Sequence, residues 1–428
     1  MPHLPAIVKV FLIFTSILVI NRFKVDLGLS IILGTFLLGL TFGMGALQTL
    51  MAMARSFADP LTVLLLLLVT FDLTMNQLME YSGQMKRMVE YFSKMVTRTR
   101  VTLAAMPAFI GLLPMPGGAY FSAPMVDAVS EKLDMTAELK TMVNYWFRHL
   151  WEYWWPMYPG VILAVTLTGL GMGKFMLMQS VYTVATILVG YFLLLRHVPD
   201  DAAAIAPDYS RATLRGFTLN ALPILTVIGG MFVLSMAAPL WKDHVTGLGD
   251  AAKYLPMLVG LIAANIITFC MNRFTRSEIR KTIINKKVGS LILLILSLMA
   301  YKYVLSACGA ITIMNQEMTA YHIPLMLVII VLPFISGMVM GISLGFVGAS
   351  FPIILSLVAG KPHLAAYVTL AYGAGYMGMM LSPIHFCLVL TRDYFRADFS
   401  GVYRYLVPAC ALMSLVILLW YVVLRYAG

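Results

Sequence analysis

Charged residues are scarce in this chain: 11% of its 428 residues are Asp, Glu, Lys or Arg, whereas 61% are hydrophobic. A soluble globular protein carries roughly 25% charged residues, so the composition excludes an ordinary soluble fold. Apolar windows of about 18 residues or more, long enough to cross a bilayer as helices, recur along the chain. The sequence therefore predicts an all-α polytopic membrane protein. The clearest windows are 27–44, 175–195, 217–238, 288–307 and 405–425.

Catalytic and metal-binding motifs are missing as well. The four cysteines stand singly, which excludes a disulfide framework and a CxxC metal site. GAGYMG at 373–378 has the spacing of a dinucleotide-binding turn, but it lies in an apolar span without flanking strands. His149 and Glu152 form HxxE without an HExxH pattern, and a zinc site there would still need a third ligand. We expect no enzyme, no metal site and no cofactor other than a coupling ion.

A soluble domain that could present a nucleic-acid-binding patch is also absent. The formal net charge is +11, which in a soluble protein would favour a nucleic-acid partner. Here the basic residues lie mostly in short segments between apolar spans, as the positive-inside rule requires of membrane proteins. We therefore expect the lipid bilayer, and no nucleic acid, as the macromolecular surroundings.

An internal repeat is what the sequence does contain. GLLPMPGGAYFSAP at 111–124 and GMVMGISLGFVGASFP at 337–352 both break an apolar run with glycine and proline. The intervals between successive breaks are 24, 17 and 32 residues in the first half and 24, 19 and 31 in the second. Such agreement predicts two related halves. The matched positions are Gly83, Pro107, Pro124 and Pro156, then Gly309, Pro333, Pro352 and Pro383.

Each half is expected to hold five transmembrane helices and one re-entrant hairpin. We assign 1–200 to the first repeat, 201–216 to a cytoplasmic linker and 217–428 to the second repeat. The expected spans are 5–21, 27–45, 61–80, 141–165 and 175–196, then 217–238, 254–271, 288–307, 365–390 and 403–425. The expected hairpins are 101–130 and 323–358.

The basic residues predict the orientation of these spans. With the N-terminus outside, 21 of the 30 Lys and Arg residues fall in inside segments and seven in outside segments. Five spans is an odd number, so the second half enters the membrane in the opposite direction. The sequence therefore predicts an inverted-topology repeat with both termini outside, in the bacterial or archaeal inner (plasma) membrane.

The glycine and proline breaks predict a central binding site. A hairpin arm of about 12–13 residues reaches roughly 18–20 Å, slightly more than half the hydrocarbon core. The turns, at 114–118 and 343–348, are then expected near the midplane. The spans 141–165 and 365–390 are also interrupted, at 155–159 and 373–383. Within the membrane, broken helices are tolerated only where they are buried in protein or line a water-filled cavity, and their free ends can bind ions there. The alternative interpretation of the glycine and proline clusters is that prolines merely kink continuous helices.

Ionisable residues in the spans are functional candidates by default. Arg148 and Glu152 stand four apart, so they could pair on one helical face, or Arg148 could hold an anionic substrate. Asp72 could bind a coupling ion or pair with Lys302, and His385 could be a satisfied interior histidine. The candidate coupling residues are Asp72, Glu152, His149 and His385.

The whole chain resembles the DUF401 family of prokaryotic membrane proteins. The resemblance lies in LLPMPGGAYFSAPMVD (112–127), NYWFRHLWEYWWPMYPG (144–160), GFVGASFP (345–352) and MMLSPIH (379–385). In architecture that family is similar to the ion-transporter superfamily of gluconate, dicarboxylate, citrate and arsenite permeases. The resemblance implies an inverted-repeat carrier, often a homodimer with an elevator-type motion. The hairpin tips lack the Ser-Asn-Thr of the sodium–dicarboxylate branch, which favours H⁺ over Na⁺ as the coupling ion.

We therefore expect a secondary active transporter of a small-molecule anion, an organic carboxylate above all, working by alternating access with proton coupling. An ion channel is one alternative, and a membrane-embedded enzyme or lipid-handling protein is another. Arg148 is the expected anion partner. The other residues expected to line the substrate site are Gly117, Gly118, Ser122, Asn144, Ser343, Gly345, Ser350 and Ser382.

Overall fold

The fold is entirely helical. The computed structural model describes residues 4–23, 25–96, 98–113, 118–131, 133–199, 207–241, 246–283 and 285–427. In these ranges the chain forms 21 α-helices, a π-helical turn, a 3-10 segment and no β-strand. The expectation of an all-α protein is confirmed for this part of the chain.

Among the described residues, six helices are long and apolar enough to cross a bilayer, and shorter apolar helices accompany them. A chain with this many apolar helices is a multi-pass membrane protein. The long helices are α4 (Pro60–Tyr81), α10 (Met172–Gly190, extended by the π-helical turn), α11 (Arg211–Met236), α13 (Leu255–Met271), α15 (Lys286–Ala307) and α21 (Phe399–Ala427). The shorter ones are α1 (Ala6–Arg22), α2 (Leu27–Thr41), α9 (Pro159–Thr168), α17 (Leu325–Met340) and α18 (Ser343–Val358).

The remaining helices pack between these spans or connect them. They form arms of the hairpins and interrupted helices, namely α6 (Thr99–Gly111), α7 (Gly118–Ser130), α8 (Ala137–Arg148), α19 (Leu364–Met380) and α20 (Phe386–Phe395). The connecting helices are α3 (Ala46–Phe57), α5 (Gln84–Met95), α12 (Ala238–Trp241), α14 (Arg276–Ile283) and α16 (Ala310–Ala320). The sequence did not predict the connecting helices, because they are too short or too polar to resemble spans.

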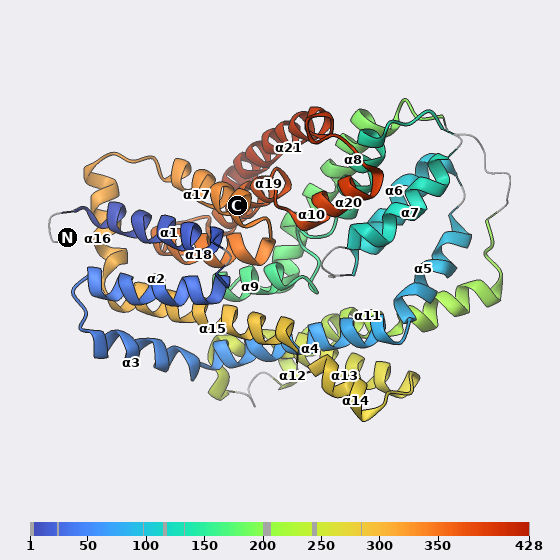
Figure 1. Ribbon diagram of the computed structural model, residues 1–428. Coiled ribbons are helices and arrows are strands. Elements are labelled where there is room, and N and C mark those ends of the chain that lie inside the picture. The colour runs from blue at the N-terminus through green and yellow to red at the C-terminus, as the bar shows by residue number, and fades with distance from the viewer. Residues whose placement is uncertain are drawn as a thin grey trace.

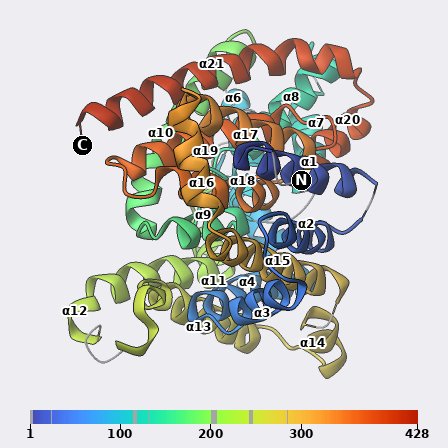
Figure 2. The same cartoon turned by 90° about the vertical axis from the view of Figure 1, so that its left-hand side faces the viewer.

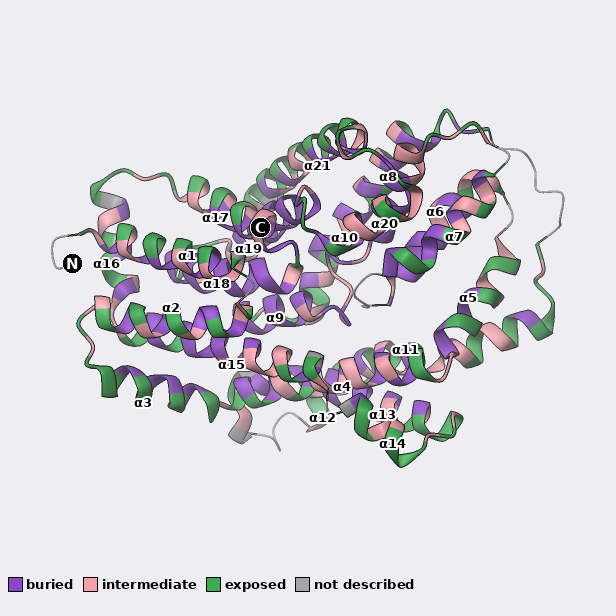
Figure 3. Cartoon of the chain, in the orientation of Figure 1, coloured by how far each residue is buried: buried purple, intermediate pink, exposed green. Residues whose placement is uncertain are grey.

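The helices divide into two sides of the molecule. In two perpendicular views α3, α4, α11, α13 and α14 lie on one side, and α19, α20 and α21 on the other (Figures 1 and 2). Burial is greatest between these sides: nearly every residue of α18 and α19 is buried, whereas α11 and α21 expose apolar side chains (Figure 3). An exposed apolar helix face is what lipid contact requires, and the buried helices form the wall of the candidate site.

The helix contacts fall into corresponding pairs between the two halves of the chain. α2 packs against α15, and α13 packs against α4. Each hairpin packs on an interrupted helix of its own half, α6 on α8 and α17 on α19. The helix after each interruption packs instead on the hairpin of the other half. α9 of the first half packs on α18 of the second, and α20 of the second half packs on α7 of the first. The helices after the breaks therefore join the two halves at the centre of the molecule.

The turn of the second hairpin lies earlier than expected. Gly341 ends α17 with a φ of 65°, a left-handed conformation that favours glycine, and α18 begins at Ser343. The predicted turn at 343–348 is therefore wrong, since these residues form the first turns of α18. In the first hairpin α6 ends at Gly111 and α7 begins at Gly118, and residues 114–117 lie outside the described ranges.

The interruption predicted at 373–383 is also shorter than expected. α19 is regular through Met380, and only 381–385 separates it from α20. The glycines that suggested a break instead allow close packing against three neighbouring helices: Gly373 against Ile417 of α21, Gly375 against Phe346 of α18, and Gly378 against α17. A Cβ atom on Gly378 would collide with the Phe334 carbonyl oxygen, and one on Gly337 would lie 2.7 Å from the Met379 nitrogen. Small residues at such a contact let two helices approach closely within a membrane.

We expect Gly378→Ala to destabilise the protein by about 1–3 kcal/mol, because the added methyl group must push α17 away from α19. Gly229→Ala is the matched control, since Gly229 lies within α11 and a Cβ atom there would meet nothing within 4 Å. Thermal unfolding of the purified protein in detergent checks this. Equal unfolding temperatures for the two variants would show that the α17–α19 contact does not need glycine.

Candidate functional site

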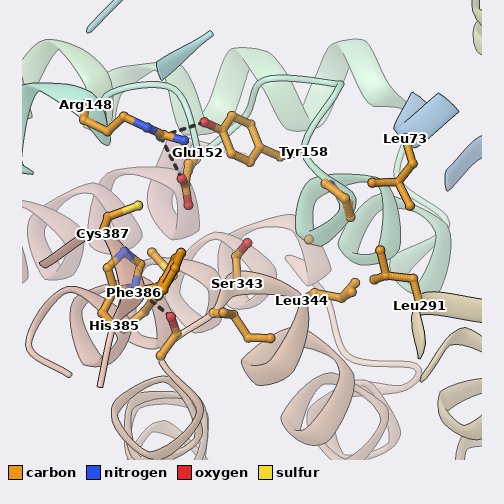
Figure 4. A pocket seen from close by; sticks show the side chains of 15 residues that line it. Leu73, Arg148, Glu152, Tyr158, Leu291, Ser343, Leu344, His385, Phe386 and Cys387 are labelled. Atoms are coloured by element: carbon orange, nitrogen blue, oxygen red, sulfur yellow. Dashed lines mark hydrogen bonds and ion pairs between the residues drawn. The ribbon is translucent and has the colours of Figure 1, made fainter. Parts of the chain in front are cut away.

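A cavity of about 200 Å³ lies where the second hairpin meets the two interrupted helices (Figure 4). Leu73 of α4 and Leu291 of α15 form an apolar wall on one side, and polar side chains line the other. The volume suits a small molecule, and the lining suits one with an apolar part and a polar part. The polar lining residues are Arg148, Glu152, Tyr158, Ser343, His385 and Cys387.

Three helices begin at this cavity. α9, α18 and α20 start at Pro159, Ser343 and Phe386, and all three residues belong to the lining. None of the three helices has a side-chain cap at its N-terminus. First-turn N–H groups have no intrahelical partner and carry a partial positive charge. Three uncapped N-termini around one cavity therefore create a site that favours an anion.

Arg148 brings a full positive charge to the same cavity. It is the last residue of α8, and its side chain is buried. Its Nη1 donates to Glu152 Oε1 over 3.1 Å and to the Tyr158 hydroxyl over 3.0 Å. Its Nη2 lies 3.5 Å from the Leu113 carbonyl oxygen. The ion pair with Glu152, one of the two alternatives for Arg148, therefore forms, but through the turn that follows α8 rather than along a helical face.

Glycine permits the close packing that holds the cavity lining in place. A Cβ atom on Gly111 would collide with the Arg148 carbonyl oxygen, so only glycine lets α6 lie against the end of α8. A Cβ atom on Gly160 would lie 2.6 Å from Ser343 Oγ, so glycine also brings the starts of α9 and α18 together. Tyr158 completes this arrangement by donating its hydroxyl to the Gly111 carbonyl oxygen over 2.5 Å.

Two histidines lie at the interruptions. His149 follows the end of α8, and His385 precedes the start of α20. Both rings are buried, and their Nε2 atoms are 3.0 Å apart. Each Nδ1 atom lies 2.6 Å from a backbone carbonyl oxygen, that of Tyr145 for His149 and that of Gly341 for His385. The pair therefore connects the two breaks and the turn of the second hairpin.

Asp72 stands apart from this cluster. It is fully buried in α4, one residue before the lining residue Leu73. Within the described ranges neither of its carboxylate oxygens has a hydrogen-bond partner, so the structure does not pair it with Lys302. Its backbone carbonyl accepts from Asn76 Nδ2 over 2.8 Å. An ionised carboxylate buried without partners is costly, which makes Asp72 the least satisfied charged group of the described spans.

The structure brings only some of the expected site residues together. Arg148, Glu152, Ser343 and His385 line the cavity, and His149 lies against His385. The sequence did not single out Cys387, although this residue follows His385 by two positions. Tyr158 lies in the segment NYWFRHLWEYWWPMYPG (144–160), where aromatic residues are so dense that the sequence does not distinguish a cavity residue from its neighbours.

The other expected residues lie elsewhere. Asn144 Nδ2 donates to the Ala119 carbonyl oxygen over 2.8 Å and to Thr391 Oγ1 over 3.2 Å, near the first hairpin. Ser122, Ser350 and Ser382 donate their hydroxyls to backbone carbonyls, a common satisfied state for a buried serine. The remaining positions are Gly118 at the start of α7, Gly345 in the first turn of α18, and Gly117, which lies outside the described residues.

A family model described as "Protein of unknown function (DUF401)" matches residues 6–424. No curated protein matches the chain. The match covers nearly the whole chain and confirms the family expected from the sequence. It does not extend to the ion-transporter superfamily.

We expect Glu152→Gln to lower the unfolding temperature of the purified protein. Removing one partner of a buried ion pair leaves the other charge uncompensated and costs about 3–5 kcal/mol. The double variant Arg148→Gln/Glu152→Gln removes both charges and should regain part of this stability. A double variant that melts no higher than Glu152→Gln would show that the two charges do not compensate each other.

Proposed function

The chain belongs to the DUF401 family, and we propose that it is a secondary active transporter that moves a small anion across the membrane by alternating access. One observation carries the proposal: Arg148 and three uncapped helix N-termini surround a single cavity inside a multi-pass membrane protein. Helices broken at the centre of a membrane bundle are the usual construction of a substrate site in carriers.

An organic carboxylate fits the cavity best among small anions. The planar guanidinium of Arg148 matches the geometry of a carboxylate, and the N–H groups at the start of α18 can donate to a second oxygen. Leu73 and Leu291 form the apolar wall that a short hydrocarbon part would contact. Glu152 already accepts from Arg148, so a substrate carboxylate shares the guanidinium instead of meeting an unpaired charge.

We also propose that the two halves are inverted repeats in a plasma membrane, with both termini outside and two re-entrant hairpins. The crossed packing of α9 on α18 and of α20 on α7 supports this, because inverted halves must meet at a shared centre. Alternating access then moves one group of helices past the other around the cavity. A homodimer with an elevator-type motion is the assembly that we propose for this movement.

Proton coupling is assigned to Asp72. Of the four coupling candidates, Glu152 accepts from Arg148, and the two histidines face each other. Asp72 alone has no hydrogen-bond partner for its carboxylate in the described chain. Moving such a group between the protein interior and water changes the cost of its charge by several kcal/mol. Proton uptake by Asp72 therefore links the protonation state to the position of α4 beside the cavity.

We expect at least one carboxylate to raise the unfolding temperature of the purified protein in a panel of carboxylates and inorganic oxyanions. A ligand at 100 times its Kd stabilises the protein by about 2.7 kcal/mol. Arg148→Gln/Glu152→Gln should lose this stabilisation, because it removes the guanidinium without leaving a buried unpaired charge. Arg276→Gln, in the exposed start of α14, is the control. Unchanged stabilisation of the double variant would contradict the role of Arg148.

We expect Asp72→Asn to abolish the acceleration of uptake by a proton gradient in proteoliposomes. Uptake down the gradient of the substrate itself should persist, because the cavity is unchanged. Glu80→Gln is the matched control, since Glu80 is an exposed acidic residue on the same helix. If a proton gradient still drives uptake by Asp72→Asn, the coupling group is another residue.

A further inference from the structure

The tautomers of the two facing histidines direct two nitrogen lone pairs at each other. A backbone carbonyl oxygen can only accept a hydrogen bond, and each Nδ1 atom lies 2.6 Å from such an oxygen. Both Nδ1 atoms must therefore carry the ring hydrogen. In the neutral form of both rings, the two Nε2 atoms then direct lone pairs at each other across 3.0 Å. This contact is repulsive unless a cation lies between the nitrogens.

Two further side chains that could bind a metal ion, those of Cys387 and Glu152, lie beside the histidines. The Cys387 sulfur and the ligand nitrogens of His149 and His385 all lie within 4.8 Å of one another, and all three residues are buried. Glu152 Oε1 lies 3.9 Å from His149 Nε2. Two imidazoles, a thiolate and a carboxylate form a donor set that zinc accepts in tetrahedral sites.

The orientation of the rings has the form that metal-binding histidines take. A ligating histidine almost always donates its other ring N–H to a carboxylate or backbone carbonyl, which fixes the tautomer and aims the free nitrogen at the metal. His149 and His385 do this through Tyr145 and Gly341. A satisfied interior histidine would need only one such bond and would have no reason to present its lone pair to a second histidine.

We propose that His149, His385 and Cys387 bind a divalent d-block metal ion, best matched by Zn²⁺, with Glu152 available as a fourth ligand. Zn–N distances of about 2.0–2.1 Å in a tetrahedral site place the two nitrogens about 3.3 Å apart, close to the 3.0 Å of the structure. The thiol must lose its proton to bind the ion, because the thiolate is the form of cysteine that ligates metals. Hard cations such as Mg²⁺ are excluded, because they prefer oxygen ligands.

The ion would join parts of the chain that are distant in sequence. His149 and Glu152 follow α8, whereas His385 and Cys387 flank the start of α20, and the His385 ring is held by the hairpin turn at Gly341. A bound ion would therefore fix the two interruptions relative to each other. Because Glu152 and Cys387 also line the cavity, the ion would add positive charge beside Arg148. The metal site does not depend on the proposed transport and is testable with the metal alone.

The test uses the full-length protein, purified, treated with a chelator, incubated with Zn²⁺ and passed through a desalting column. Bound zinc is then quantified by mass spectrometry. We expect about one ion per chain at a three- or four-ligand site. We expect His385→Gln and Cys387→Ser to lose most of this zinc. His322→Gln, in an exposed turn, and Cys410→Ser, buried in α21, are the matched controls and should retain it.

Cobalt provides a second measurement, which does not require the metal to stay bound through a desalting column. A Co²⁺-loaded protein should show the charge-transfer absorption of a thiolate–cobalt bond, absent from Cys387→Ser and present in Cys410→Ser. Size-exclusion profiles establish that each variant is folded before it is compared. Wild-type protein that retains no zinc, or zinc that stays in the His385→Gln and Cys387→Ser variants, would overturn the metal site. A proton shared between the two Nε2 atoms, with no metal bound, is the arrangement that the first of these results would indicate.

Discussion

A helix that ends inside hydrocarbon leaves backbone N–H and C=O groups that water cannot reach, and each unsatisfied group costs several kcal/mol. Several helices of this multi-pass protein begin or end at its centre. α8 stops at Arg148, α19 stops at Met380, and three other helices begin beside them. The surrounding structure compensates for these breaks. Tyrosine hydroxyls reach into them, as Tyr376 donates to the His149 carbonyl oxygen over 2.6 Å and Tyr372 to that of Glu152 over 2.8 Å.

The same constraint explains how the breaks become a site. Carbonyl oxygens at the ends of α8 and α19 have buried side-chain partners: that of Tyr145 lies 2.6 Å from His149 Nδ1, and that of Met380 accepts from the Tyr145 hydroxyl over 2.9 Å. The N-termini of α9, α18 and α20 have no side-chain caps and face the cavity instead. An anion in the cavity would accept hydrogen bonds from the N–H groups at these N-termini, for which the fold provides no side-chain acceptor. Arg148 adds charge, and Glu152 keeps that charge compensated when the cavity holds no anion.

Glycine and proline predicted the hairpins and interrupted helices but not their exact turns. Both hairpins were expected within a few residues of their observed arms, because proline and glycine clusters are rare in apolar spans. The turn at Gly341 was misplaced because Gly345 and Gly348 looked like loop residues, whereas they sit in α18 and allow close approach to Met340 and Leu298. A single sequence does not distinguish a glycine that bends a chain from one that admits a neighbouring helix.

The sequence likewise identified some residues of the candidate site and missed others. Arg148, Glu152 and His385 were identifiable, because ionisable residues are expensive in apolar spans. Cys387 was not, because a lone cysteine in such a span resembles any small buried residue. Its proximity to His149 arises from the packing of α20 against α8, a contact between residues more than 200 positions apart that no local pattern encodes.

The central claim is that this cavity carries an anion across the membrane, and counterflow measures it most directly. Proteoliposomes are loaded with an unlabelled carboxylate that stabilises the protein and are diluted into a trace of the labelled compound. A carrier that exchanges its substrate predicts transient accumulation of label above the outside concentration. Label that only equilibrates, as through a channel, or that never enters, as with an enzyme, would contradict the account.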